Sequence, residues 1–122
     1  MERLTLPTGR DIFIEADGRR LAAVESYRAQ ALRDLYPVEV LGNAQPVGLV
    51  KGPERYRLEL RRVLFQEDVD FHGLADFNVV IVRPGGRVIY TGCEWEQISD
   101  GAAAGEAFAE NVVITARKRR VI

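Results

Sequence analysis

The amino-acid sequence predicts a mainly β domain of the α+β class, a sandwich or barrel of six to seven strands with one short helix. Two strong turn signals, Asp17-Gly18 and Pro84-Gly85-Gly86, separate runs of apolar residues. Residues 54–65 alternate between apolar and charged side chains, the period of a strand with one buried face. Short strands separated by turns are typical of sandwiches and barrels. We therefore expect one such domain over residues 1–122.

The first half of the chain predicts strands around one long loop. Residues 11–16 form a short strand, and the turn after them favours a returning strand over residues 19–34. The apolar positions of that second segment also fit a helical stripe, so a helix remains the competing prediction there. Residues 36–53 carry glycine and proline at near-regular intervals, which predicts an ordered, extended loop and hairpin.

The strand over residues 54–65 loses its alternation near its end. Arg61 and Arg62 are both charged, and three apolar residues follow them. A β-bulge, or the exit of the strand from the sheet, would explain this change of phase.

The second half of the chain predicts one short helix and three further strands. Residues 66–76 are short and acidic, which indicates one or two helical turns ending near Gly73. Residues 77–84 form a buried strand, and residues 87–99 pair back on it. We expect Ile89, Thr91, Cys93 and Trp95 on one face of that strand. A small-residue loop over 100–107 and a last strand over 108–122 complete the chain.

Composition places the chain among ordinary globular proteins. It has 122 residues, of which 47% are hydrophobic and 29% charged, so it is long enough to bury a core. The single cysteine, Cys93, excludes an internal disulfide and fits a reducing compartment. No apolar run reaches the roughly 18 residues of a membrane helix, and the N-terminus lacks the apolar core of a signal peptide. We expect no membrane insertion, and a protein made in a cytoplasm.

Charge is unevenly distributed although the net charge is only −1. Residues 67–110 hold nine acidic and two basic residues, whereas residues 117–120 read RKRR. Such a separation permits identical subunits to present opposite signs to one another. A solvated surface with local excesses of charge is the alternative interpretation.

No group of residues indicates catalysis, a cofactor or a metal. Asp68, Asp70, His72 and Asp76 lie close in sequence and have metal-binding chemistry, but they match no EF-hand or HExxH pattern. Cys93 stands in phase with apolar neighbours, which favours a core residue over a nucleophile paired with His72. Trp95 is expected in the core rather than at an interface. The glycines of GNAQPVG and RPGGR lack a phosphate-binding arrangement. The RKRR segment alternates its side chains in a strand, which favours a charged edge strand over a nucleic-acid site.

The order of these segments resembles that of bacteriophage tail tube proteins, including those of contractile tails and of phage-derived bacteriocin particles. The matching segments are FIEADGRRLAAVESYRAQ, then PVEVLGNAQPVGLVKGPERYRLELRRV, and finally VIYTGCEWEQISDGAAAGEAFAENVVITARKRR. The resemblance covers most of the chain. It implies a tail-tube-like fold with a short helix, and a structural role without enzymatic activity.

The resemblance also implies an assembly. Six copies would close into a ring, and rings would stack, as in a tail tube or a tube-like baseplate or hub ring. Further partners would be sheath and baseplate or hub proteins, with DNA passing through the lumen without specific binding. The particle would be assembled in the bacterial host cytoplasm. The loop over residues 33–52 would reach the neighbouring subunit or ring. Its candidate interface residues are Arg33, Asp34, Leu35, Tyr36, Leu41, Asn43, Gln45, Pro46, Val47, Leu49 and Lys51.

Two functions of other classes remain as alternatives. The first is a small monomeric β-barrel binding module that takes a ligand or peptide at its mouth. The second is an enzyme that uses the Asp and His residues of segment 66–76 with a metal. A persistent monomer at high concentration would favour the binding module.

Overall fold

The computed structural model describes residues 11–42, 44–45, 47–103 and 106–122. In order, its strands are β1 Ile12–Ala16, β2 Arg19–Leu32, β3 Leu35–Val38, β4 Gly48–Lys51, β5 Arg55–Phe65, β6 Phe77–Arg83, β7 Gly86–Ala103, β8 Glu106–Ala116 and β9 Lys118–Val121. A 3-10 turn, η1, spans Phe71–Gly73 and is the only helical element among the described residues. The predicted mainly β fold with one short helix is confirmed.

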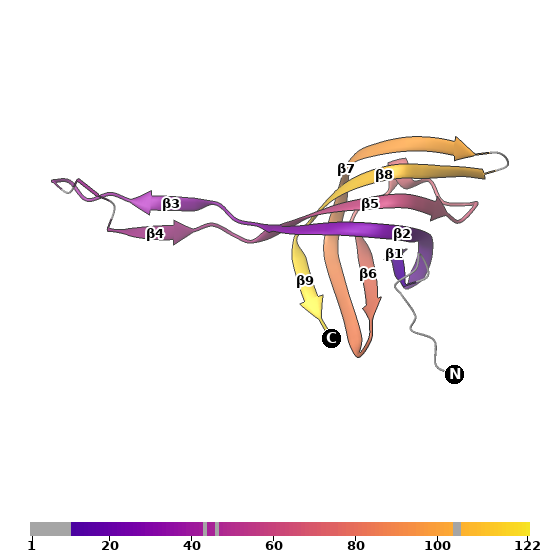
Figure 1. Cartoon of the computed structure of the whole chain (residues 1–122), viewed down its shortest axis with the longest axis horizontal. Coiled ribbons are helices and arrows are strands. Elements are labelled where there is room, and N and C mark those ends of the chain that lie inside the picture. Colours follow the sequence, from indigo (N-terminus) through magenta and orange to yellow (C-terminus); the bar gives the residue numbers. More distant parts are fainter. Residues whose placement is uncertain (1–10, 43, 46, 104–105) are drawn as a thin grey trace.

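Six of the strands close into a barrel. The sheet order is β6-β1-β2-β5-β8-β7-β9, and β6 also pairs with β7, which joins the two ends. All of these pairings are antiparallel. The seventh strand, β9, lies beside β7 outside this closed ring. β3 and β4 form a separate two-stranded sheet that projects away from the barrel (Figure 1).

The core fills the barrel with aliphatic and aromatic side chains. Buried residues come from all six strands of the closed ring, and in β5 they alternate with less buried ones up to Leu60. The largest of them are Phe77, Ile14, Leu58, Leu60, Ile114, Val24, Val63, Val79, Val88 and Val112. No polar or charged side chain among the described residues is buried.

The first hairpin confirms a strand over residues 19–32, in place of the competing helix. Asp17 and Gly18 adopt φ values of 53° and 76°, the left-handed pair that a tight two-residue hairpin turn needs. β1 then pairs with β2 from Phe13 opposite Ala23. The predicted turn at residues 84–86 is also present, with Gly85 at φ 84°.

The change of phase near Arg62 is neither a bulge nor an exit from the sheet. The pairing of β5 with β2 keeps one register on both sides of Arg62, from Tyr27 opposite Leu60 to Val24 opposite Val63. Arg62 itself adopts φ 50°. This single left-handed residue turns the strand so that Leu60 and Val63 both face the core.

Three predictions about the second half of the chain are wrong. Gly92 at φ 63° reverses the phase of β7, so Val88 and Tyr90 face the core before it and Cys93 after it, not Ile89 and Thr91. The expected loop over 100–107 is a continuation of β7 and β8, with Ala102 opposite Ala107. Residues 104–105 lie outside the described residues. The last strand is interrupted at Arg117, which lies against Gly92.

Candidate assembly surface: the arm and the open strand edges

The most exposed element is the two-stranded extension formed by β3 and β4, here called the arm, residues 32–54. It continues the directions of β2 and β5 beyond the barrel (Figure 1). Leu35 pairs with Lys51 and Val38 with Gly48, so the arm is a regular antiparallel ribbon. Every described residue from 32 to 51 is exposed. Both faces of the ribbon are therefore open to solvent.

The arm carries most of the exposed large apolar side chains of the described chain. Leu41 is fully exposed and Leu49 is 61% exposed. The complete set on the arm is Leu32, Leu35, Tyr36, Val38, Val40, Leu41, Val47, Leu49 and Val50. Outside it, only Leu64, Val121 and Ile122 among the described residues have the same character. Exposed apolar side chains gathered on one element make the arm a candidate interaction surface.

Polar contacts fix the base of the arm to the barrel. The N–H of Gly52 donates to the carbonyl of Asp34 at 2.8 Å, and Arg55 pairs with the Asp34 carboxylate at 3.3 Å. A Cβ on Gly52 would lie 3.3 Å from that same carbonyl oxygen. The Tyr36 hydroxyl also lies 3.5 Å from the Asp34 carboxylate. These contacts give the exposed ribbon a defined root.

The structure places the predicted interface residues together on the arm. Arg33, Asp34, Leu35, Tyr36, Leu41, Gln45, Val47, Leu49 and Lys51 all lie there and are all exposed. Asn43 and Pro46 lie outside the described residues. Sequence reasoning missed Leu32, Val38, Val40 and Val50, which are exposed on the same ribbon. Since neither face of a two-stranded ribbon is covered, every apolar residue in segment 32–50 could have been included.

Two long strands leave part of one edge unpaired. β2 pairs with β1 only as far as Ala23, so beyond that residue its edge opposite β5 faces no strand among the described residues. β7 pairs with β6 only as far as Cys93, and its edge opposite β8 is free beyond that point in the described chain. β9 adds a third free edge. Unpaired strand edges are templates for pairing with another chain.

The long strands also present a broad polar face away from the core. Residues between the buried positions of β5 point outward, and Arg57 pairs with Glu59 there at 2.9 Å. Across the strands, Arg61 stands opposite Ser26 and Asn111. Thr115 donates to the Glu96 carboxylate on the same side. This face carries both basic and acidic groups, with Arg57, Glu59 and Arg61 in succession along β5.

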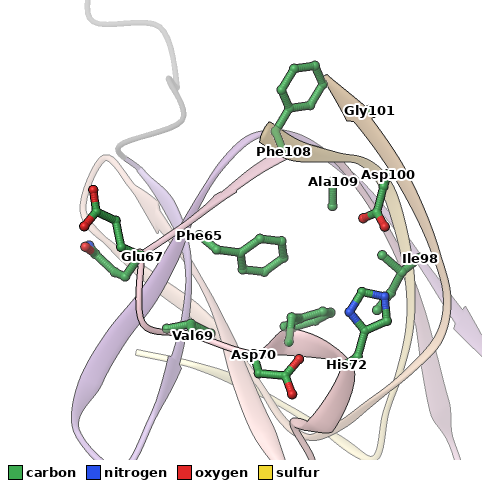
Figure 2. A pocket seen from close by; sticks show the side chains of 12 residues that line it. Phe65, Glu67, Val69, Asp70, His72, Ile98, Asp100, Gly101, Phe108 and Ala109 are labelled. Carbon is green, nitrogen blue, oxygen red and sulfur yellow. The ribbon is translucent and has the colours of Figure 1, made fainter. Parts of the chain in front are cut away.

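The open end of the barrel holds a depression, here called the mouth. It has a volume of about 600 Å³ and lies between η1 and the hairpin of β7 and β8 (Figure 2). Phe65 points into it from the left, and His72 and Asp100 point into it from the right (Figure 2). Phe71 lies beneath, 3% exposed, with its ring centroid 4.9 Å from that of Phe65.

The four residues considered for a metal do not gather into one site. Asp70 and His72 line the mouth, whereas Asp76 lies in a separate depression beside Arg117. Asp68 instead pairs with Arg19 at 2.5 Å, which lowers the pKa of its carboxyl. Among the described residues, no three His, Cys, Asp or Glu side chains are close enough to hold a metal ion.

Cys93 and Trp95 both pack with the core. Cys93 is fully buried, and its thiol donates to the carbonyl of Tyr90 at 3.3 Å. Burial raises the pKa of this thiol to about 12, so it is not a nucleophile near neutral pH. Trp95 is half-buried against the core and donates its ring N–H to the carbonyl of His72 at 3.3 Å. It therefore attaches η1 to β7.

The basic segment lies on β9 and its approach, at the edge of the sheet as the sequence predicts. Arg117, Lys118, Arg119 and Arg120 are all exposed. No helix in the described part of the chain has the length and apolar character needed to cross a membrane.

Comparison with known families and with curated proteins finds no match. Solved structures do match. One is a chain from a structure described as "Virion of native gene transfer agent (GTA) particle", with 13% identity and a TM-score of 0.54, covering 96% of this chain and 99% of that one. Another is Hcp1 from Flavobacterium johnsoniae, with 13% identity and a TM-score of 0.48, covering 90% and 93%. The resemblance to tail tube proteins is thus confirmed at the level of the fold: this chain has, over nearly its whole length, the fold of a chain in a virus-like particle.

Proposed function

We propose that this protein is a structural subunit of a phage or phage-like particle, which assembles with copies of itself into a ring around a channel. The observation that carries the proposal is the arm, with its nine exposed large apolar side chains on a ribbon that leaves the barrel. A monomer gains nothing from this exposure, whereas a neighbouring copy would cover it. The shared fold with a chain of a virion supports the same role.

The proposed assembly is a ring of six copies. The free edges of β2 and β7 would pair with neighbouring subunits, since a heterologous contact that closes after a fixed rotation gives a ring. The arm would reach the adjacent subunit or the next ring. The polar face of β5 and its neighbours would line the lumen, where its mixed charges would let DNA pass without holding it.

The proposed setting is a tail tube, or a tube-like baseplate or hub ring, of a contractile particle assembled in the bacterial host cytoplasm. Sheath and baseplate or hub proteins would be the further partners. The work of such a protein is mechanical, and we propose no enzymatic activity for it.

The test is to change the arm and to follow assembly. Removing residues 42–48, or substituting Leu41→Asp together with Leu49→Asp, should leave a folded monomer, because no arm residue belongs to the buried core. Rings should be lost, which negative-stain electron microscopy and light scattering across a concentration series would show.

The matched control is Leu64→Asp, which places the same charge on an exposed apolar residue outside the arm. It should still assemble. Rings that form equally well without residues 42–48 would remove the arm from the proposal.

The mouth supports a second candidate function, a monomeric binding module, because a depression of about 600 Å³ with an aromatic floor is large enough for a small ligand. A wild-type chain that stays monomeric at high concentration, and shows no particle in the microscope, would favour this candidate instead.

A further inference from the structure

The mouth combines an apolar floor with an acidic rim. Phe71, Phe65 and Ile98 form part of the floor, while Glu67, Asp70 and Asp100 bring three carboxylates to the lining. His72 is the only basic residue there. A ligand that fits this surface needs apolar groups and positive charge next to one another.

The rim carboxylates have no cationic partner within the described part of the chain. Asp68, their neighbour in sequence, is different, because Arg19 holds its carboxylate with contacts of 2.5 and 2.7 Å. No ion pair among the described residues involves Glu67, Asp70 or Asp100. The negative charge of the mouth is therefore available to a partner.

The C-terminal segment has the complementary chemistry. Four exposed basic residues, 117–120, are followed by Val121 and Ile122, which are 62% and 60% exposed. None of the four bases forms an ion pair within the described residues. On β9 itself, Arg119 and Val121 lie on one face and Lys118 and Arg120 on the other, so both faces carry positive charge and one also carries an apolar side chain.

The segment is held as a strand and is presented rigidly. β9 pairs with β7 from Thr91 opposite Lys118 to Val88 opposite Val121. Ile122 and Arg87 then exchange two backbone hydrogen bonds, of 2.9 and 3.0 Å. Since the strand is already ordered, its docking would cost little conformational entropy.

A single copy cannot bring these two surfaces together. The strand β7 links them: its residues 88–91 hold β9, and its residues 98–101 line the mouth. β9 and the hairpin of β7 and β8 lie on different sides of the barrel (Figure 1). The complementary surfaces therefore point to an intermolecular contact.

We propose that the mouth of one copy receives the C-terminal strand, residues 117–122, of a second copy. This rests on the proposed function, since it names one of the contacts through which the copies assemble. The contact is heterologous, so it repeats from copy to copy and builds a ring or a stack. The arm tip fits the mouth less well, because its one charged residue between 35 and 50, Glu39, has the same sign as the rim.

Charge reversal tests the contact. One variant reverses the rim with Asp70→Lys and Asp100→Lys, and the other reverses the strand with Lys118→Glu and Arg120→Glu. Lys118 and Arg120 neighbour Thr91 and Ile89 on β7, away from the buried Val88 and Tyr90, so both chains should fold. Each variant alone should self-associate at least about tenfold more weakly than wild type in sedimentation equilibrium.

The decisive measurement is the mixture of the two variants. The reversed rim of one variant then complements the reversed strand of the other, so an equimolar mixture should assemble with the two variants in alternation. A single chain that carries all four changes should also assemble, because its own rim and strand again have opposite signs. Assembly of both controls also shows that the variants are folded. High salt should weaken wild-type association, because the contact is electrostatic.

Four outcomes would overturn the proposal. Single variants that associate as wild type does would show that the mouth and the strand do not meet, while the proposed function stands. Loss of association without rescue in the mixture, or an effect of the rim reversal alone, would point to another occupant, such as the arm. A wild-type chain that remains monomeric would contradict the proposed function itself.

Discussion

Arg62 shows how one residue changes which side chains of a strand face the core. Its φ of 50° lets Leu60 and Val63, three positions apart, both enter the core, and the facing strands β2 and β8 follow without a change of register. Its side chain pairs with Glu25 at 3.3 Å and lies 4.9 Å over the ring centroid of Phe108. The guanidinium group of Arg62 thus has partners, although the backbone conformation at this position favours glycine.

Substitutions at Arg62 separate the conformation from the side-chain contacts. Arg62→Gly and Arg62→Val both remove the contacts, but only valine opposes the left-handed backbone. We expect the valine variant to have a free energy of unfolding about 1–2 kcal/mol lower than that of the glycine variant, as measured by urea denaturation. The same two changes at Arg61, which has no positive φ, should give the opposite order, because valine favours strands. If the glycine variant were the more stable of the two at both positions, or the valine variant at both, the assigned conformation of Arg62 would be contradicted.

Burial of the Cys93 thiol makes the stability of the folded chain depend on pH in the alkaline range. Its folded-state pKa of about 12 stands above the ordinary value of 9.0, so the thiol contributes its full stabilisation below pH 9. Above pH 9 the unfolded chain loses its thiol proton and the folded chain keeps it. Stability is then lost at about 1.4 kcal/mol per pH unit until pH reaches about 12. The difference in unfolding free energy between wild type and Cys93→Ala, measured from pH 7.5 to 11, should fall along this line, and a constant difference would refute it.

At the scale of elements, η1 closes the barrel between β5 and β6. Its one buried residue, Phe71, packs between Phe65 and Phe77, with ring centroids at 4.9 and 5.2 Å. Trp95 holds the turn from β7. A turn of three residues has little stability of its own, so these aromatic contacts keep it in place.

Removing the Phe71 ring should therefore destabilise the whole barrel. We expect Phe71→Ala to lower the unfolding free energy by about 3–5 kcal/mol, since it leaves a cavity in the core. Leu64→Ala, at a 45% exposed position nearby in sequence, should cost less than about 1 kcal/mol. Both substitutions would be made in the chain without residues 42–48, so that urea denaturation measures the free energy of unfolding without a contribution from assembly. Similar losses for the two would show that η1 is not part of the core.

Sequence patterns predicted an element well where one period held over most of its length. The alternation of residues 54–65 identified β5, and Asp17-Gly18 located the first turn. They failed where one residue changes the phase, as Gly92 does in β7, because a glycine that permits a positive φ does not reveal that it adopts one. β8 ends at Ala116, just before Arg117, which lies against Gly92. The sequence around Arg117 does not indicate this end.

At the scale of the whole molecule, the core and the candidate assembly surface are separate. The buried residues belong to the barrel and η1, whereas the arm contributes none. Sequence reasoning found the arm, since glycine and proline mark it. It did not find the free edges of β2 and β7 or the mouth, because these arise from which strands become neighbours across the sheet.

The closure of the barrel also determines when this chain is able to fold. β1 lies between β2, its neighbour in sequence, and β6, whose Ile81 pairs with Ile12. During synthesis the first hairpin emerges early, yet its outer edge stays uncovered until β6 has left the ribosome. Such distant pairings slow folding and keep apolar strands accessible to one another in the meantime. The two strands of the arm are close in sequence, so the arm would form sooner. A nascent chain would therefore expose the apolar side chains of the arm before the barrel is complete.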